Sequence, residues 1–403
     1  MLVMKFGGTS LADASRFKDV LNIVRANGGT EADVVVLSAM SGVTNGLIAC
    51  AHEAQMGDCV GALEKLAVLK ARHLQVVDEL FSASVGARLA EPADTANTGG
   101  YNPPLQFQRS GVDLKGQNAL LQERLEADFN KLTVLLQGIA YLGELSKRSL
   151  DAVGSCGELL SSQIFAAFAQ WQGFAARFVD ARSFIVTSND YGRALPIMPE
   201  IISRCETQIM PVIKKGECVI TQGFVGATTD GVTTTLGRGG SDYSAALIGA
   251  AMDADEIQIW TDVDGMMTAD PRLIPEAKPI ARVSFQEAAE LAYFGAKVLH
   301  PLTIKPAVEK NIPVRILNTL NPKSPGTLIM AKVDSTEPSG MPIVVQADNA
   351  EASGALSVAQ TDNIEPSGNG KSPKTTGQIC AIASKKGLAA RLVGKSPSWS
   401  GDG

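Results

Sequence analysis

Apolar runs and amphipathic patterns alternate from the first residues of this chain. Residues 2–6 form a short apolar run that ends in two glycines, and Phe17, Val20 and Val24 then recur at helical spacing. Residues 34–37 form a continuous apolar run, typical of a strand buried on both faces, and a second helical stretch follows. Strand, helix, strand and helix in this order predict an α/β domain with a mainly parallel sheet.

The alternation continues along most of the chain. Long helices are predicted over residues 61–81 and 117–150, and residues 157–172 are apolar nearly all round, as in a buried helix. Ser10, followed three residues later by Asp13, resembles a capping box at the start of the first helix. Further strand-like runs occur at residues 178–179, 218–225, 233–236, 256–260 and 312–317. These runs extend the α/β pattern to about residue 331.

Two stretches lack this periodicity. Residues 91–111 are rich in Gly, Pro, Asn and Thr, and we interpret them as a surface insertion without an assigned function. Beyond residue 331 the chain is rich in Ser, Gly and Pro, and most of it is too polar to pack alone, so we expect a partly disordered tail. We therefore predict a domain over residues 1–331, a polar linker over residues 332–376 and a final segment over residues 377–403.

The composition narrows the classes of function. The 403 residues include 36 Lys and Arg against 42 Asp and Glu, and this acidic balance argues against a partner held by its nucleic-acid phosphates. No run approaches the roughly 20 apolar residues of a membrane helix, and the first residues do not resemble a secretory signal. Six scattered cysteines without a Cys-x-x-Cys pair indicate reduced thiols in a cytoplasmic protein. With only three histidines, chemistry built on several imidazoles is nearly excluded, and we expect no protein-built metal site.

The first segment with candidate chemistry is Lys5-Phe6-Gly7-Gly8-Thr9-Ser10. A lysine ends a predicted strand, and two glycines lead into a helix start, where backbone N–H groups and a lysine charge can hold a phosphate. The spacing differs from that of a Walker A loop. An ordinary strand-to-helix turn with a solvated lysine explains the same residues, so the segment alone does not decide between the two interpretations.

A second segment, Gly237-Arg238-Gly239-Gly240-Ser241-Asp242, precedes an apolar helix. Arginine is suited to bidentate binding of a carboxylate, and the glycines allow a close approach. Asp242 could simply cap the helix. A cap, however, needs neither three glycines nor an arginine beside it, so an anion site is the favoured interpretation.

Acidic residues follow the predicted strand at residues 256–260. Thr261, Asp262, Asp264 and Asp270 lie in a loop without the ligand spacing of a calcium loop. Open α/β sheets bind ligands outside the carboxyl ends of their strands, which makes this loop a candidate nucleotide site. A solvated acidic loop is the alternative.

Three further ionisable residues lie at helix ends. Glu158, in the first turn of the buried helix, could offset the helix dipole or face a site that holds a cation such as an ammonium group. Lys297 ends an apolar helical segment, as helix C-terminal cations commonly do. His300 precedes a proline and is interpreted as structural.

These segments occur together, and in this order, in the aspartate kinases of the amino-acid kinase superfamily. The chain resembles that family from residues 5–10 to residues 325–329, and residues 36–45 and 220–224 match it as well. The combination is much more specific than any one segment. The resemblance implies a three-layer αβα sandwich around a mainly parallel sheet of about eight strands.

The same resemblance implies a reaction and its ligands. The chain would transfer the γ-phosphoryl group of ATP, with Mg²⁺, to the β-carboxylate of L-aspartate. The product, 4-phospho-L-aspartate, begins the synthesis of lysine, threonine and methionine. A carboxylate is already ionised at pH 7 and needs no general base, which suits a chain with few histidines.

The resemblance also implies roles for individual residues. Lys5 and Lys297 would stabilise charge on the transferred phosphoryl group, and Asp242 would hold both lysines in position. Arg238 would bind the α-carboxylate of the substrate and Glu158 its α-ammonium. The other substrate-binding residues would be Ser38, Thr44, Gly239, Gly240 and Ser241. The nucleotide would contact Lys5, Gly7, Gly8, Ser10, Thr261, Asp262, Met267, Arg272 and Lys297.

Two features depart from the family pattern. Met267 stands where the family commonly has tyrosine, and since a thioether can also pack on adenine or ribose, we expect altered nucleotide affinity. Aspartate kinases usually continue into paired ACT modules that bind lysine or threonine, whereas residues 378–388 resemble only the opening strand and helix start of one. We therefore expect a truncated or atypical regulatory end without the usual feedback, and a homodimer is possible.

Two other classes of function stay open. Another amino-acid kinase, such as a glutamate kinase, would use the same fold, although Glu158 with Arg238 favours a free α-amino acid over acetylglutamate or UMP. A non-catalytic or regulatory relative would bind ATP and an amino acid without turnover. The presence of both lysines and of Asp242 argues against that second class.

Overall fold

The computed structural model describes residues 1–27, 33–82, 114–269, 274, 276–293, 301–331, 384–385 and 388–389. Several predicted features lie outside the described residues: the insertion at 91–111, Arg272, Lys297, His300, the linker at 332–376 and most of the final segment. Within the described part of the chain, no helix is both long enough and apolar enough to cross a membrane.

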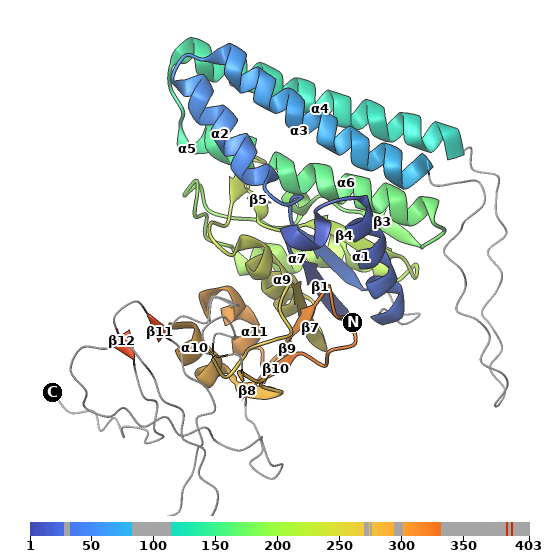
Figure 1. The fold of residues 1–403 in the computed structure, drawn as a ribbon, viewed down its shortest axis with the longest axis vertical. Helices are drawn as coiled ribbons and strands as arrows, with labels where there is room; N and C mark the ends of the chain where they lie inside the picture. Colours follow the sequence, from blue (N-terminus) through green and yellow to red (C-terminus); the bar gives the residue numbers. More distant parts are fainter. Residues whose placement is uncertain are drawn as a thin grey trace, which may run out of the picture.

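A mainly parallel sheet forms the centre of the described fold (Figure 1). Its eight strands have the order β3-β4-β2-β1-β7-β9-β10-β8. The strands from β3 to β9 are parallel to their neighbours, whereas β10 is antiparallel to β9 and parallel to β8. The bounds are β1 Leu2–Phe6, β2 Val34–Leu37, β3 Ala176–Phe178, β4 Cys218–Gln222, β7 Glu256–Thr261, β8 Arg282–Ser284, β9 Val314–Asn318 and β10 Thr327–Met330. The predicted sheet is confirmed.

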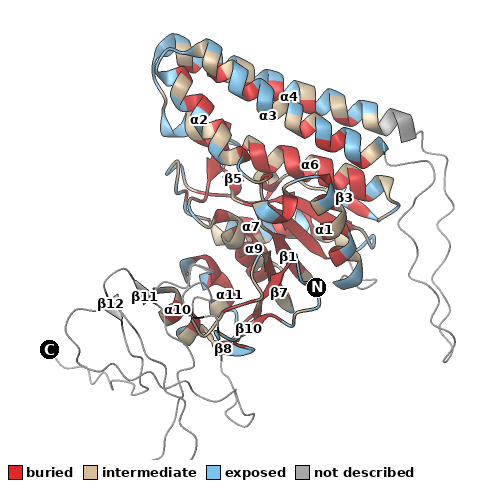
Figure 2. Ribbon diagram, in the orientation of Figure 1, coloured by how far each residue is buried: buried red, intermediate tan, exposed pale blue. Residues whose placement is uncertain are grey.

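The central strands are buried on both faces. Met4 and Phe6 of β1 belong to one hydrophobic core and Val3 to a second, because successive side chains of a strand point to opposite faces. All four residues of β2 are fully buried, as their continuous apolar run predicts. Figure 2 shows the buried strands lying between helices whose outer faces are exposed.

Helices cover both faces of the sheet and complete the three layers. Core residues of α1, α2, α3, α4 and α6 belong to the first core, and those of α7, α9, α10 and α11 to the second. Their bounds are α1 Ala14–Asn27, α2 Val43–Gln55, α3 Cys59–Ser82, α4 Leu114–Leu142, α5 Lys147–Gly154, α6 Cys156–Trp171, α7 Met198–Gln208, α8 Met210–Ile213, α9 Gly240–Ala251, α10 Phe285–Tyr293 and α11 Lys305–Glu309. Short 3₁₀ turns are η1 Gly8–Leu11, η2 Ala181–Ser183 and η3 Pro301–Ile304. The predicted buried helix over residues 157–172 corresponds to α6.

Two helix predictions differ from the structure. The single helix expected over residues 117–150 is divided into α4 and α5, because Gly143 adopts a left-handed φ of 64° and the Ser146 hydroxyl then caps α5. The expected capping box is also absent from the described start of α1: Asp13 accepts from the Arg16 N–H, but the Ser10 hydroxyl bonds to Thr319 instead. Both differences arise from local turns that periodicity does not register.

Three strand predictions differ from the structure. The run at residues 218–225 divides after Gln222, and the chain continues into a two-stranded antiparallel ribbon of β5 (Val225–Ala227) and β6 (Thr233–Thr235). The short strands β8 and β10 were not predicted, because three or four residues carry little periodicity. Near the end, β11 (Ser384–Lys385) pairs antiparallel with β12 (Leu388–Ala389), where the resemblance to an ACT module predicted the start of a helix.

Candidate active site

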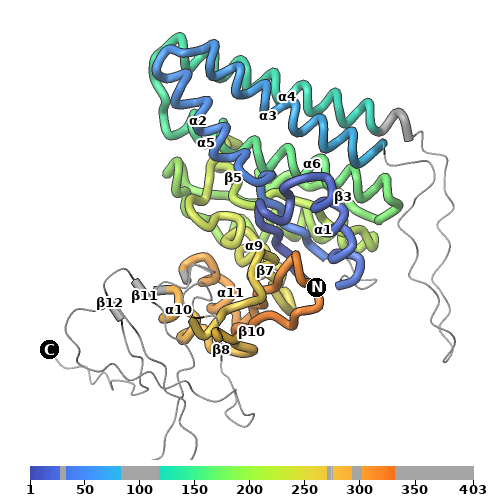
Figure 3. Tube along the Cα trace, viewed as in Figure 1, coloured from blue at the N-terminus to red at the C-terminus, as the bar shows by residue number. Residues whose placement is uncertain are grey.

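The site lies outside the carboxyl ends of the parallel strands. From β1 the chain passes to β2 on one side, whereas β7 pairs with the other side, so β1 is the point at which the strand order reverses. Figure 3 shows this path, with the first strand beside a strand from much later in the chain. Ligands of open α/β sheets bind at such a point.

Two cavities of about 420 and 410 Å³ open there and share lining residues. The first is lined by Lys5, Gly7, Gly8, Ser38, Thr44, Glu158, Phe224, Gly237, Arg238, Gly239, Gly240, Ser241 and Asp242. The second shares Gly7, Gly8, Ser38, Thr44 and Glu158 and adds Thr9, Ala39, Met40, Ser41, Gly42, Asn45, Thr261 and Asp262. The structure therefore gathers most of the described site residues that the sequence predicts.

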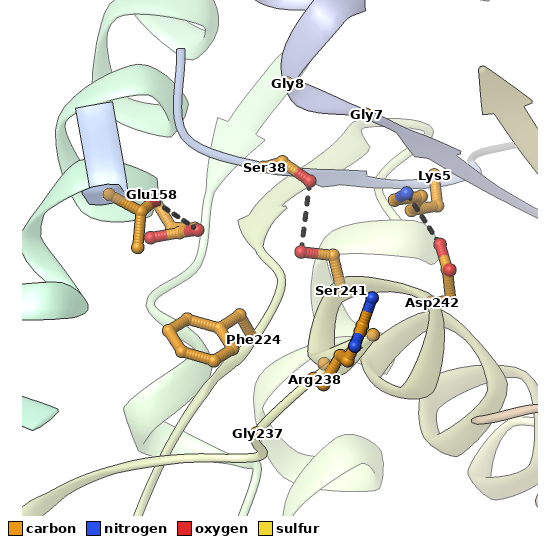
Figure 4. Close-up of a pocket in the computed structure, with 13 residues that line it drawn as sticks. Lys5, Gly7, Gly8, Ser38, Glu158, Phe224, Gly237, Arg238, Ser241 and Asp242 are labelled. Atoms are coloured by element: carbon orange, nitrogen blue, oxygen red, sulfur yellow. Dashed lines mark hydrogen bonds and ion pairs between the residues drawn. The ribbon is translucent and has the colours of Figure 1, made fainter. Parts of the chain in front are cut away.

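Lys5 and Asp242 form an ion pair at one end of the first cavity (Figure 4). The Lys5 Nζ lies 2.6 Å from Asp242 Oδ1, and the two side chains are 11% and 16% exposed. Asp242 stands in the first turn of α9 without capping it, since the residue at the cap position is Gly239. The ion-pair role implied for Asp242 toward Lys5 therefore has a geometric basis, and the capping alternative has none.

The segment before α9 presents an arginine to the cavity. Gly237 and Gly239 have left-handed φ values of 76° and 73°, conformations that glycine adopts without the strain of a Cβ. Arg238 between them is exposed, and within the described part of the chain it forms no ion pair or hydrogen bond. The Ser38 hydroxyl donates to Ser241 Oγ over 3.0 Å and joins the end of β2 to the start of α9.

Glu158 lies at the opposite side of the cavity from Lys5 and Asp242 (Figure 4). It is 5% exposed, and its Oε1 accepts from the Thr44 hydroxyl over 3.2 Å. Its Oε2 is buried without a hydrogen-bond partner among the described residues. Burial raises the pKa of this carboxyl to about 7, although bonds from the backbone N–H groups of Glu158 and Ala39 and from Thr44 act in the opposite direction.

The predicted nucleotide residues are only partly gathered. Thr261 and Asp262 line the second cavity, and the Thr261 hydroxyl donates to Asp262 Oδ1 over 3.1 Å. Met267 lines neither cavity and forms an isolated β-bridge with Pro279. Arg272 and Lys297 lie outside the described residues.

Ser10 lies beneath the glycine turn and lines neither cavity. It is 1% exposed, its N–H donates to the Gly7 carbonyl oxygen, and its hydroxyl lies 2.7 Å from Thr319 Oγ1. Thr319 in turn donates to the Thr261 carbonyl oxygen over 3.0 Å. The side chain of Ser10 thus connects the glycine turn to the loop after β7.

Sequence reasoning missed several residues of the site. Phe224 lines the first cavity with a φ of 67°, an uncommon conformation for a bulky residue; its segment matched the family pattern but received no role. Arg72 of α3 donates to the carbonyl oxygens of Ser41 (2.7 Å) and Ala12 (2.8 Å), and thereby holds the loop that lines the second cavity. No local signal distinguishes Arg72 from other helix-surface arginines.

The chain is similar in sequence to proteins of a known family. A model of the amino acid kinase family matches residues 1–318. Over 335 residues the chain is 35% identical to the lysine-sensitive aspartokinase 3 of Escherichia coli strain K12, an alignment that covers 83% of this chain and 65% of that protein. It is 38% identical over 344 residues to the chloroplastic aspartokinase 1 of Arabidopsis thaliana, covering 83% and 53%. The chain therefore spans between half and two thirds of the length of these two relatives.

A solved structure shares the fold. The crystal structure of E. coli aspartokinase III in complex with aspartate and ADP matches with a TM-score of 0.69 and 33% identity, over 86% of this chain and 67% of that one. The same enzyme in complex with lysine and aspartate matches equally well. With the family model matched over most of the described fold, the chain belongs to the amino acid kinase family.

Proposed function

We propose that this chain is an aspartate kinase, which transfers the γ-phosphoryl group of ATP to the β-carboxylate of L-aspartate. The observation that carries the proposal is the charge arrangement of the first cavity. Glu158 offers a buried carboxylate oxygen without a partner, and Arg238 offers a guanidinium without an ion pair among the described residues. An α-amino acid presents the complementary ammonium and carboxylate groups.

The end of the cavity with Lys5 suits the transferred phosphoryl group. A Cβ on Gly7 would lie 3.7 Å from Lys5 Nζ, so the glycine leaves room beside the ammonium for phosphate oxygens. In the reaction a β-carboxylate oxygen forms a bond to the γ-phosphorus while the bond to the ADP oxygen breaks, and no proton needs to move. Positioning and cationic stabilisation are then the main requirements, and Lys5 supplies one such cation.

The nucleotide would occupy the second cavity. Thr261 and Asp262 line it, and Gly7 and Gly8 line both cavities, which supports a position for the phosphates between the two ligands. Ser10 would support the glycine turn from below rather than touch phosphate. We also assign the roles implied by the resemblance to Met267, Arg272 and Lys297, which complete the nucleotide side of the proposal.

Mg²⁺ would enter with the nucleotide and neutralise phosphate charge. In the described part of the chain no three His, Cys, Asp or Glu side chains are grouped as a metal site, and Mg²⁺ typically keeps waters and phosphate oxygens as its ligands. We therefore propose no protein cage for it. The known relatives support the choice of substrate, since the matching E. coli enzyme was crystallised with aspartate and ADP.

The test is ADP release with MgATP in the presence of L-aspartate, L-glutamate or buffer, with hydroxylamine added to trap an acyl phosphate. We expect an aspartate-dependent hydroxamate. Replacing Arg238→Ala should raise the KM for aspartate about tenfold to a hundredfold, because a charged hydrogen-bond partner of the α-carboxylate is lost. Faster turnover of glutamate would instead indicate a glutamate kinase, and ATP binding without turnover would indicate a non-catalytic relative.

A further inference from the structure

Asp151 is a buried carboxylate that lines neither cavity. It lies on α5, is 3% exposed, and accepts three hydrogen bonds from a distant part of the chain. Its Oδ2 accepts from the N–H groups of Gly192 (2.9 Å) and Thr235 (3.0 Å), and its Oδ1 accepts from the Thr235 hydroxyl (2.6 Å). Burying a carboxylate costs free energy unless hydrogen bonds compensate it, so Asp151 holds the backbone segments that donate these bonds in fixed positions.

The donors of these bonds belong to the base of the arginine segment. Thr235 ends β6, and the chain then passes through Leu236 and Gly237 into Arg238. The turn at Gly192 packs directly on this segment: a Cβ on Gly237 would lie 3.1 Å from the Gly192 carbonyl oxygen. Asp151 therefore fixes both the strand that leads to Arg238 and the turn that supports it.

The backbone of Asp151 leads directly to the helix that bears Glu158. Ser155 is at once the residue after α5 and the residue before α6, and its N–H donates to the Asp151 carbonyl oxygen over 3.0 Å. Glu158 lies in the first turn of α6. The backbone of Asp151 is thus continuous with the helix that bears Glu158, while its side chain holds the segment that bears Arg238.

We propose that Asp151 is a positioning residue that sets the spacing between Glu158 and Arg238 and so favours aspartate over its longer homologue glutamate. The inference rests on the proposed function, in which these two residues bind the α-ammonium and the α-carboxylate. With both α-groups held at fixed places, the length of the side chain decides where its carboxylate lies relative to the phosphoryl donor. A displacement of about 1 Å at such a site can cost a hundredfold in rate.

The test compares four variants: Asp151→Ala, Asp151→Asn, Thr235→Val and Leu132→Ala. Asp151→Ala should raise the KM for aspartate about tenfold or more and reduce the ratio of kcat/KM for aspartate over glutamate. The KM for ATP should change much less, because the three side-chain bonds of Asp151 go to Gly192 and Thr235, neither of which lines the second cavity. Asp151→Asn should retain most of the selectivity, since its amide oxygen can accept both N–H groups while its NH₂ donates to the Thr235 hydroxyl.

The remaining variants separate positioning from general destabilisation. Thr235→Val removes only the hydroxyl bond and should give a smaller change in the same direction, which also serves if Asp151→Ala does not fold. Leu132→Ala opens a cavity in α4, where the side chain is 1% exposed, and should lower the melting temperature without changing the selectivity.

Two failures can be distinguished. If the unmodified chain gives no aspartate-dependent turnover, the proposed function is wrong and the role of Asp151 falls with it. If the unmodified chain turns over aspartate but both Asp151→Ala and Thr235→Val keep its selectivity and its KM for aspartate, Asp151 is a structural residue only. A parallel rise in the KM for ATP and for aspartate would have the same meaning.

Discussion

The two ends of the first cavity hold their carboxylates in different ways. At one end Asp242 lies 2.6 Å from the ammonium of Lys5, so its charge is compensated within the protein. At the other end Glu158 is more deeply buried, at 5% exposed, and its Oε2 has no hydrogen-bond partner among the described residues. The carboxylate at the first end has an ammonium beside it, whereas the carboxylate at the second end would gain one only when a cation binds. This difference indicates where the ammonium of a substrate would enter.

The unpartnered end has a cost in stability. A rise of the Glu158 pKa from 4.5 to about 7 corresponds to a free energy on the order of 3 kcal/mol in favour of the neutral form. A bound ammonium would recover much of this free energy, since an opposite charge favours the ionised carboxylate. The free energy that the site loses by burying this carboxylate therefore favours binding of an ammonium group.

The largest expected effect on activity comes from removing the cation beside Asp242. Lys5→Met removes the cation and leaves Asp242 without its partner. We expect kcat to fall roughly a hundredfold to a thousandfold, because one preorganised charge at the transferring phosphoryl group is lost. The KM for aspartate should change little, since Lys5 lies at the other side of the cavity from Glu158. Steady-state ADP release at saturating MgATP measures both constants.

A surface lysine provides the control for that substitution. Lys310 pairs with Asp253 at the surface, with side chains 48% and 77% exposed, and lines neither cavity. Lys310→Met should leave kcat within about twofold, as expected for an exposed ion pair. If Lys5→Met were as active as Lys310→Met, the phosphoryl-stabilising role of Lys5 would be refuted.

A smaller effect on activity is expected from a substitution of Glu158. Glu158→Gln removes the charge that would bind the ammonium, so the KM for aspartate should rise about tenfold to a hundredfold while the KM for ATP stays nearly constant. Because the ionised form binds the ammonium, the KM of the unmodified chain should fall as the pH rises through about 7. A KM profile that is the same in both proteins would contradict this role of Glu158.

Glu158 also makes the free energy of unfolding depend on pH, and the sign of this dependence follows from its pKa shift. The folded pKa of Glu158, about 7, is above the ordinary value of 4.5, so between these pH values the folded state binds more protons than the unfolded state. The contribution of Glu158 to stability without ligand is therefore lost as the pH rises through this window. Glu158→Gln should remove the slope and be more stable than the unmodified chain at pH 8, as urea unfolding at several pH values would reveal.

The sequence predicted the parts of the molecule that repeat a pattern. Continuous apolar runs such as residues 34–37 placed the central strands, since a strand buried on both faces is mostly apolar at successive positions. The short strands β8 and β10 and the break at Gly143 escaped prediction, because a few residues or a single turn leave no periodicity. Topology, not propensity, decided which strands became neighbours.

Some residues of the site could likewise be predicted from the sequence, and others could not. Lys5, Glu158 and Arg238 could be singled out because charged residues beside glycines or in an apolar helix are locally unusual. Asp151 and Arg72 could not, because each acts through bonds to segments that are distant in the sequence. Which groups touch a ligand can be inferred from local composition, but which groups hold them in place depends on contacts that only the fold creates.

The smallest effect on activity is expected at a buried group that lines neither cavity. Its pH-dependent contribution to stability has the opposite sign to that of Glu158. His73 of α3 is fully buried, its Nδ1 bonds to the Leu69 carbonyl oxygen, and its ring lies edge-on to Phe129. Burial lowers its pKa from 6.5 to about 4, with Arg72 acting in the same direction and the Leu69 carbonyl opposing it. At His73 the unfolded state therefore binds more protons between these values, and the contribution of this residue to stability is lost as the pH falls through them.

His73→Leu should remove this acid-side slope, just as Glu158→Gln removes the slope of opposite sign. Kinetic constants for aspartate and ATP should stay within about twofold, because the loss of a buried imidazole affects folding rather than the charges of the site. The two pH windows overlap, so the contributions of His73 and Glu158 largely cancel in the unmodified chain. Urea unfolding between pH 4 and 8 should therefore show in each single variant the slope of the group that it keeps, and neither slope in the double variant. If His73→Leu altered the KM for aspartate, the pH dependence of binding could no longer be assigned to Glu158 alone, since His73 neighbours Arg72, which holds the loop of the second cavity. The comparison between the two ends of the cavity therefore depends on this variant being kinetically silent.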